Sequence, residues 1–280
     1  MVLNDAPVAP VRRGRWAWPV VVLVSAVCTI TVVLGTLGSG PTRPPRAAAA
    51  LPVATLSPHA PPPPATALQR LIKDRPIFFS GSTRGRVVAL TFDDGPGPYT
   101  VRIVAMLRHL KATATFFEIG SQIAPYRALV ARMVKWGFVI GDHTWSHPNL
   151  ERLSNARVRT QLVSTMKLVT KISGQQVQLV RPPYGAQNTR IRTDVGRLGL
   201  LSVLWNIDTR DWTQPGTQAI VVHALAVRAG GIILLHDGGG LRSQTVAALP
   251  AIVHGLRARD FRIVTIPQLL VIAPPTSIHY

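Results

Sequence analysis

The sequence predicts a barrel-like α/β fold of about seven parallel strands, preceded by one N-terminal transmembrane helix. From residue 86 onward, short apolar β-branched runs alternate about seven times with amphipathic helical stretches. Such alternation is typical of parallel strands joined by crossover helices, and about seven units in one domain favour a barrel over an open sheet. Ahead of this part, a run of 22 residues without a charge lies close to the N-terminus.

The composition excludes several classes of protein. The single cysteine forms neither an internal disulfide nor a multi-thiolate zinc site, so any metal must be held by histidines and carboxylates. Lys and Arg outnumber Asp and Glu by 9 to 2 in residues 1–84 and by 22 to 10 in residues 85–280. Because this positive charge is spread and no nucleic-acid motif is present, we expect no nucleic-acid partner and a surface suited to anionic membranes or acidic polymers.

The first 83 residues predict three segments. Residues 1–15 form a basic cytoplasmic tail, and residues 16–38 a membrane anchor, since about 20 apolar residues cross a bilayer. The catalytic domain would then lie outside the cell on a single-pass protein. The alternative is a cleaved signal peptide, which would release the protein; Ala47–Ala50 offers a cleavage site, but the apolar run is longer than is usual for such peptides. Residues 39–83 form a Pro/Ala-rich linker that spaces the domain at 84–280 from the membrane.

The globular part is expected to contain strands and helices in alternation. The predicted strands are Val87–Phe92, Ala114–Ile119, Phe138–Ile140, Gln178–Val180, Leu201–Ile207, Gly231–Leu235 and Phe261–Ile266. The clearest predicted helices are Val101–Leu110, Tyr126–Trp136, Ala156–Ile172 and Thr245–Arg257.

Polar clusters follow five of these strands, and they hold six of the twelve acidic residues. The clusters are Asp93-Asp94-Gly95-Pro96, Asp142 to Pro148, Arg181 to Gly185, Asp208 to Trp212, and His236-Asp237. Each has a structural explanation by itself: the first is a good turn sequence, and Arg181 with Asp208 is a possible structural ion pair. The chemistry of such barrels lies at the carboxyl ends of the strands, so the joint placement predicts an active site.

These clusters resemble the five motifs of the polysaccharide deacetylases with a NodB-homology domain, carbohydrate esterase family 4. The motifs occur in the family's order, as TFDDGP at 91–96, HTWSHP at 143–148, RPPYG at 181–185, DTRDW at 208–212 and LLH at 234–236. The resemblance covers residues 86–270 and implies a distorted (β/α) barrel.

Two imidazoles and one carboxylate leave open positions on a divalent ion, as a catalytic site requires. Asp94, His143 and His147 are the candidate ligands, and the resemblance assigns the same three. We expect His147 in a loop, because Pro148 disfavours helical geometry before it. Zinc is the expected metal, and cobalt or nickel is compatible with these ligands.

Asp93 and Asp94 are adjacent, so we expect their side chains to diverge if one of them binds metal. Asp93 is then the expected general base for a water activated by the ion, and Arg181 would orient it through a charge-assisted pair. A departing amine needs a proton, and His236 fits as the general acid. The resemblance implies that Asp211 orients His236 and that the Tyr184 amide stabilises the oxyanion.

A small apolar pocket for the acetyl methyl is expected from Trp212, Leu234 and Pro183, although the first two read equally well as core residues. Asp208 would support the wall of the site, through Arg181. Asp142 and Glu118 depart from the residues that the family commonly has at these positions; Asp142 either changes metal affinity or hydrogen-bonds a loop. The glycines after His236 predict a flexible rim loop.

These observations favour a metal-dependent hydrolase that removes N-acetyl groups from a cell-wall glycan, with peptidoglycan the leading substrate. The alternatives are deacetylation of chitooligosaccharides or O-acetylated xylan, hydrolysis of a small C–N substrate, and an inactive wall-binding module. The expected partners are the glycan and, through the N-terminal helix, the membrane.

Overall fold

The computed structural model describes residues 68–69, 72 and 77–275. The predicted basic tail (1–15), the membrane anchor (16–38) and most of the linker (39–83) therefore lie outside the described residues. Within the stretch assigned to the linker, the described chain already forms a short strand, β1 (Ile77–Phe78), which pairs with a strand more than a hundred residues later.

The described residues form one sheet of nine parallel strands, in the order β1-β6-β5-β4-β3-β2-β8-β7, with β9 paired to the first half of β2. The strands after β1 are β2 (Val87–Asp93), β3 (Thr115–Glu118), β4 (Val139–Asp142), β5 (Leu179–Val180), β6 (Leu201–Val203), β7 (Ile207–Asp208), β8 (Ile232–His236) and β9 (Arg262–Val264). Every pair is parallel, as the alternation of strands and helices predicted.

The prediction of about seven strands was too low for two reasons: β1 was not predicted, and one apolar run contains two strands. The predicted strand Leu201–Ile207 divides into β6 and β7, which lie near opposite ends of the sheet order. Between them the chain leaves one edge and joins the other, with the Asn206 amide and side-chain oxygen both bonded to Ile232. Apolar composition alone does not reveal such a crossing.

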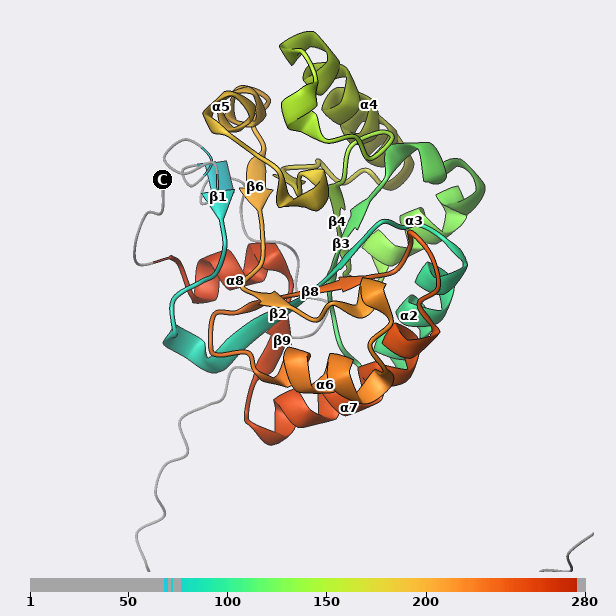
Figure 1. Ribbon diagram of the computed structural model, residues 1–280, viewed down its shortest axis with the longest axis vertical. Helices are drawn as coiled ribbons and strands as arrows, with labels where there is room; N and C mark the ends of the chain where they lie inside the picture. Colours follow the sequence, from blue (N-terminus) through green and yellow to red (C-terminus); the bar gives the residue numbers. More distant parts are fainter. Residues whose placement is uncertain (1–67, 70–71, 73–76, 276–280) are drawn as a thin grey trace, which may run out of the picture. The chain divides into compact units, whose positions relative to one another are not determined.

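This crossing makes the sheet curl. Only three residues separate Val203 from Ile207, and four Cα–Cα steps span at most about 15 Å. The two ends of the sheet must therefore lie close together, although no hydrogen-bonded ladder joins β1 to β7 in the described chain. The result is a curled half-barrel, the distorted form of a (β/α) barrel (Figure 1).

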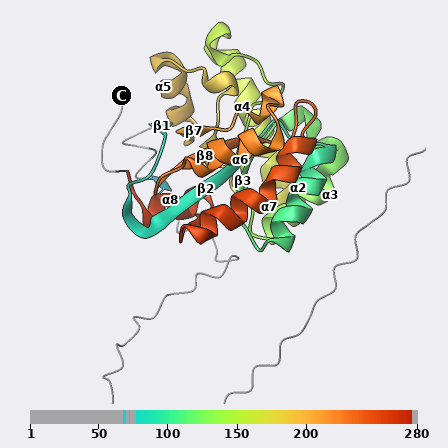
Figure 2. The same cartoon turned by 60° about the horizontal axis from the view of Figure 1, so that its bottom comes forward.

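Helices pack on both faces of the curled sheet: most of them cover its outer face, and the last, Ile266–Ile272, packs against the core on the other face. They are α2 (Pro98–His109), α3 (Arg127–Lys135), α4 (Asn155–Ser173), α5 (Thr189–Arg197), α6 (Thr217–Leu225), α7 (Ser243–Ala258) and α8 (Ile266–Ile272). Neighbouring helices pack side by side, α2 on α7 and α7 on α6, and α3 on α4 and α4 on α5 (Figures 1 and 2). The four helices expected from sequence correspond to α2, α3, α4 and α7.

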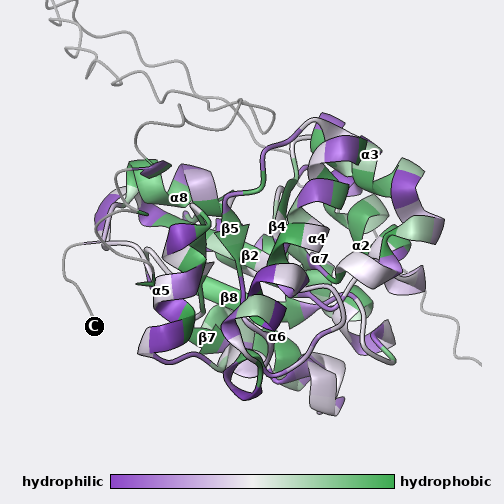
Figure 3. Cartoon of the chain, turned by 90° about the horizontal axis from the view of Figure 1, so that it is seen from above, coloured by the Kyte–Doolittle hydropathy of each residue, from purple (hydrophilic) through white to green (hydrophobic). Residues whose placement is uncertain are grey.

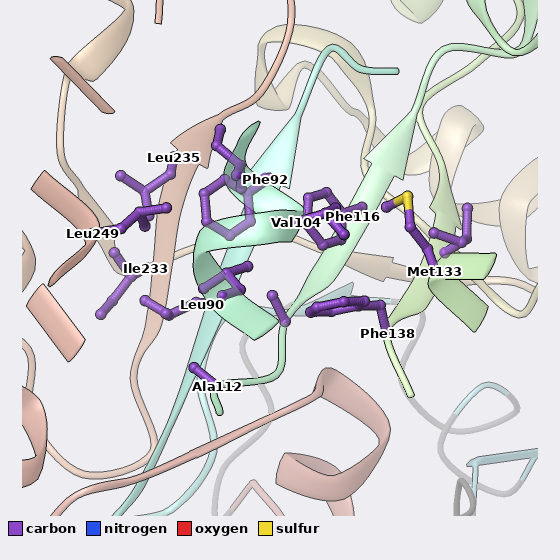
Figure 4. Packing of buried hydrophobic residues seen from close by; sticks show 14 of the residues in the cluster. Leu90, Phe92, Val104, Ala112, Phe116, Met133, Phe138, Ile233, Leu235 and Leu249 are labelled. Atoms are coloured by element: carbon purple, nitrogen blue, oxygen red, sulfur yellow. The ribbon is translucent and has the colours of Figure 1, made fainter. Parts of the chain in front are cut away.

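The two faces of β2 bury two separate apolar cores. Leu90 and Phe92 face the helices, where Phe92 stacks on Phe116 at a ring-centroid distance of 5.0 Å (Figure 4). Val87 and Ala89 point the other way, into a second core that includes residues of α8. Because successive side chains alternate between faces, a strand that is apolar throughout is one buried on both sides. Figure 3 shows the corresponding hydrophobic centre inside helices of mixed character.

The predicted single-pass membrane location is contradicted. The described residues contain no helix long and apolar enough to span a bilayer. The longest of these helices, α4, has 19 residues but exposes Arg157, Arg159, Lys167 and Lys171 on its outer face. The segment behind the prediction, residues 16–38, lies outside the described residues, and the predicted membrane partner is withdrawn with it.

Candidate active site

The polar clusters of the sequence meet at one edge of the sheet. Because the strands are parallel, their carboxyl ends point the same way, and the ladder pairs Asp93 with His236 and Asp142 with Val180, the residue before Arg181. The side chains enclose a cavity of about 460 Å³. It is lined by Asp93, Asp94, His143, His147, Pro182, Tyr184, Gly185, Trp205, Asp208, Trp212, Leu234, His236, Gly239 and Arg242.

Asp94, His143 and His147 lie together with the spacing of metal ligands. Asp94 Oδ1 lies 3.4 Å from His143 Nε2 and 3.2 Å from His147 Nε2, and the three ligand atoms all fall within 4.8 Å of one another. His143 Nδ1 lies 2.6 Å from the carbonyl oxygen of Arg181. Since a carbonyl only accepts, Nδ1 carries the proton and Nε2 presents its lone pair to the site.

The chemistry of these donors fits a cation. Asp94 Oδ1 is buried and accepts no hydrogen bond, although two imidazole nitrogens lie beside it. Burial would raise the pKa of Asp94, but His143 and His147 outweigh burial and hold it well below its usual range. An anionic oxygen and two ring nitrogens without an aligned donor are what a divalent first-row ion would satisfy.

Left-handed backbone conformations gather at this site. The φ angles of Asp94, Thr144, His147 and Tyr184 are 75°, 69°, 59° and 62°, a region that residues other than glycine adopt rarely. His147 lies in a loop, as expected. The turn at Asp94 also corrects one expectation, since the Asp93 and Asp94 carboxylates do not diverge: both come within 3.8 Å of His143 Nε2.

Arg181 is fully buried and holds Asp93 in place. Its Nη1 donates to Asp93 Oδ1 at 2.7 Å and to Thr91 Oγ1 at 2.9 Å. Nε and Nη2 donate to the carbonyl oxygens of Val203 and Leu204 at 3.0 and 3.1 Å. Burial lowers the pKa of Arg181 and the Asp93 carboxylate opposes that shift, so the two charges stabilise each other.

The expected link between Arg181 and Asp208 is wrong. Asp208 is exposed on the cavity wall, and its carboxylate accepts from the backbone N–H of Arg210 instead. The buried guanidinium already has an acceptor for each of its nitrogens, with Asp93 as its carboxylate partner. Asp208 therefore supports the wall only through its own turn.

His236 lines the cavity and is held by Asp211. Its Nδ1 donates to Asp211 Oδ1 at 2.7 Å, and its backbone N–H donates to Oδ2 at 2.9 Å. Thr245, in the first turn of α7, also donates to Oδ2. Burial lowers the pKa of His236, but the hydrogen bond and charge of Asp211, with the charges of Asp93 and Asp94, give a net shift upward.

Of the residues predicted to form the acetyl pocket, two line the cavity and one does not. Trp212 and Leu234 both line the cavity, the first half exposed and the second buried. Pro183 is buried, and its neighbour Pro182 lines the cavity in its place. Tyr184 is 69% exposed, and the edge of its ring contacts His147 at a centroid distance of 4.8 Å.

Three further carboxyl groups are buried behind the site. Asp142 accepts a 2.6 Å hydrogen bond from the backbone N–H of Thr144, so of its two expected roles it has the one in which it hydrogen-bonds a loop. Burial raises the pKa of Asp142 well above the usual range. Burial and the charge of Asp237 raise the pKa of Glu118 as well, and neither Glu118 oxygen has a hydrogen-bond donor in the described chain. Burial therefore favours the protonated, neutral form of both groups.

Sequence reasoning missed Trp205 and Arg242 among the cavity residues. It interpreted the glycines after His236 only as a flexible loop, but two of them are needed because the loop backbone packs directly against Asp94. A Cβ on Gly238 would lie 1.9 Å from the Asp94 carbonyl oxygen, and one on Gly239 would lie 2.5 Å from Asp94 Oδ2. The glycines let this loop pass against the candidate ligand and carry the chain on to Arg242.

Comparison with known proteins agrees with this geometry. The family model for polysaccharide deacetylase matches residues 80–203. A peptidoglycan-N-acetylglucosamine deacetylase of Bacillus cereus is 39% identical over 189 residues, covering 66% of this chain and 88% of that protein. A chitooligosaccharide deacetylase of a Bradyrhizobium species is 36% identical, covering 66% and 90%.

Among solved structures, a peptidoglycan N-acetylglucosamine deacetylase superposes with a TM-score of 0.68 at 30% identity, covering 75% of this chain and 98% of that one. These matches bear out the resemblance that the five motifs carry. The chain belongs to the polysaccharide deacetylase family, carbohydrate esterase family 4.

Proposed function

We propose that this protein is a metal-dependent hydrolase that removes N-acetyl groups from a glycan, with peptidoglycan as the favoured substrate. The observation that carries the proposal is the convergence of Asp94 Oδ1, His143 Nε2 and His147 Nε2 beside the Arg181–Asp93 pair. Candidates for the metal ligands, the base and the acid all line one cavity, which argues against an inactive binding module.

Asp94, His143 and His147 would hold the ion, with zinc as the proposed metal and cobalt or nickel as compatible alternatives. Such an ion supplies Lewis-acid polarisation of the acetyl carbonyl and makes water more acidic. Asp93 takes the proton from the attacking water, because Arg181 fixes one of its oxygens and leaves the other, Oδ2, facing the site. This arrangement fixes the orientation of the base.

His236 completes the reaction as the general acid. The upward shift of its pKa favours the protonated ring, which donates to the nitrogen of the departing amine. Asp211 holds the ring through Nδ1, which leaves Nε2–H as the donor. We propose the backbone N–H of Tyr184 as the donor to the oxyanion and Trp212 with Leu234 as the surface for the acetyl methyl.

The substrate class rests on the relatives and on the rim of the cavity. The relatives named above act on peptidoglycan and on chitooligosaccharides, both of which carry N-acetylated sugars. The rim exposes Tyr184 and Trp212, with Trp145 also exposed on the loop between the two candidate histidine ligands. Exposed aromatic rings suit sugar rings better than a small amide, so glycan deacetylation is favoured over hydrolysis of a small C–N substrate.

The test is acetate release by the purified full chain from peptidoglycan, chitooligosaccharides and acetylated xylan, with and without a chelator. We expect release from peptidoglycan that is lost on complete metal removal and restored by zinc. The Asp93→Asn variant should lower kcat by about 10²–10⁴-fold while it still binds glycan. The matched control is Asp260→Asn, which makes the same change at an exposed position remote from the site.

Two results would contradict the proposal. Acetate release that persists in metal-free protein would remove the metal from the reaction. Glycan binding by the wild-type protein, without acetate release from any of the three substrates, would favour the binding module.

A further inference from the structure

Arg242 is a buried arginine that lines the catalytic cavity and has no role in the mechanism above. It lies between the glycine loop that follows β8 and the first turn of α7. Only 4% of its surface is exposed. It shares the cavity with Asp94, Trp212 and His236, so a group bound there would be next to the reacting atoms.

The guanidinium of Arg242 has fewer partners than its burial requires. Nη1 donates to the carbonyl oxygen of the preceding residue, Leu241, at 2.7 Å, and the buried Nε has no acceptor. No carboxylate in the described part of the chain lies within 4.0 Å of it. Arg181 differs in each respect, since its Nε, Nη1 and Nη2 all have acceptors and one of them is a carboxylate. An uncompensated buried charge is costly, so an acceptor from outside the chain would be bound strongly.

The surroundings of Arg242 add positive potential and leave room for an anion. Helix α7 begins at the next residue, has sixteen residues and carries no acidic side chain in its first turn. Its amino end therefore places a partial positive charge beside the guanidinium. On the other side lies Gly240, where an added Cβ would sit 3.5 Å from Nη1. No side chain from that position covers the guanidinium.

We infer that Arg242 is a substrate-binding residue that takes a carboxylate carried by the glycan. Asp93, Asp94 and Asp208 also line the cavity, and their charge would repel an anionic substrate. An arginine can offset that repulsion and bind a carboxylate through two parallel N–H donors. The lactyl group of muramic acid ends in a free carboxylate wherever no peptide is attached to it, whereas chitin units are neutral. The inference rests on the proposed function and narrows its substrate to an acidic glycan.

The test compares three substrates of equal length: a peptidoglycan oligosaccharide with a free lactyl carboxylate, the same oligosaccharide with that carboxylate converted to the primary amide, and a chitooligosaccharide. We expect the wild-type chain to show a higher kcat/KM on the acid than on the amide. Arg242→Gln should reduce that preference at least tenfold, and Arg242→Lys should reduce it less. Arg228→Gln, which removes the same charge from an exposed position outside the cavity, should keep the wild-type preference.

Binding is measured separately, by calorimetry on Asp93→Asn protein with the acid and the amide, so that the inference is tested even if no acetate is released. A wild-type chain that releases acetate from none of the substrates defeats the proposed function, while tighter binding of the acid that depends on Arg242 still supports the inference. An equal loss on all three substrates in Arg242→Gln would make the residue structural. If acetate inhibited Arg242→Gln less than the wild-type chain, while the preference for the acid over the amide stayed unchanged, Arg242 would bind the product acetate and not the glycan carboxylate. Either result overturns the inference.

Discussion

Replacement of Arg181 by Met tests whether the buried pair with Asp93 is the electrostatic support of the base. Arg181 is fully buried and the Asp93 side chain is 5% exposed, so neither charge has water as an alternative partner. Removal of one member of such a pair typically costs about 3–5 kcal/mol, because the other charge stays buried and unpaired. Domains of this size have about 5–15 kcal/mol of stability in total, so the loss is large.

The assay is urea unfolding followed by tryptophan fluorescence, with a chelator present so that metal binding does not contribute. The Arg181→Met change is made in the wild-type chain and again in Asp93→Asn. We expect its cost to be smaller by at least about 2 kcal/mol in the second background, where no buried charge is left unpaired. The control is Arg197→Met, whose 3.6 Å pair with Asp194 involves a side chain that is 72% exposed and should be worth about 0–1 kcal/mol.

An equal cost in the two backgrounds would refute the reasoning, because it would mean that Arg181 stabilises the fold only through its bonds to the backbone. In the same variants, acetate release should fall at least tenfold with Arg181→Met, since the base loses its orientation and its partner charge. A normal kcat in a folded Arg181→Met protein would remove this residue from the positioning of the base.

Three further predictions follow from the surroundings of the site. Burial, with the charges of Asp94 and its neighbours, raises the pKa of Asp237 to about 7 from 3.8, so the folded state binds that proton more tightly and stability should fall as the pH rises from about 4 to 7. Asp237→Asn should flatten this slope, which urea midpoints at pH 4.5 and 7.5 would show. Asp211→Asn removes the partner that raises the pKa of His236, so the alkaline limb of the kcat profile should move to lower pH; an unmoved limb would assign the acid elsewhere. In Gly238→Ala the new methyl would overlap the Asp94 carbonyl oxygen, and zinc affinity measured by competition with a chromophoric chelator should fall at least tenfold.

Much of the site was predictable because it lies where strand periodicity ends. Asp93 and His236 each come directly after a predicted strand, and parallel pairing brings such ends to one edge of a sheet. The motif order then pointed to the candidate ligands, base and acid, and the structure brings these residues to one cavity. That inference needed only the position of polar residues relative to apolar runs.

Other features depend on contacts that sequence periodicity does not encode. The division of Leu201–Ile207 into β6 and β7 depends on pairing with strands far away in the sequence, β5 for one and β8 for the other. The partner of Arg181 is decided by a buried geometry in which Asp208 is exposed and out of reach. The role of Arg242 is hidden for the same reason, because its burial and its missing acceptor appear only after the glycine loop has been folded against Asp94.

The predicted membrane location failed for a different reason. It rested on one apolar segment near the N-terminus, outside the described residues, and none of the described helices is able to span a bilayer. The fold and the cavity do not depend on that segment.

The most direct test of the central claim is to measure bound metal and acetate release on the same samples of the full chain, from metal-free to saturated with zinc. We predict that release rises in proportion to occupancy and saturates at one ion per chain, and that Asp94→Ala, His143→Ala and His147→Ala each lose both the ion and the activity. Acetate release that does not depend on bound metal, or one ion per chain retained in all three variants, would contradict the account.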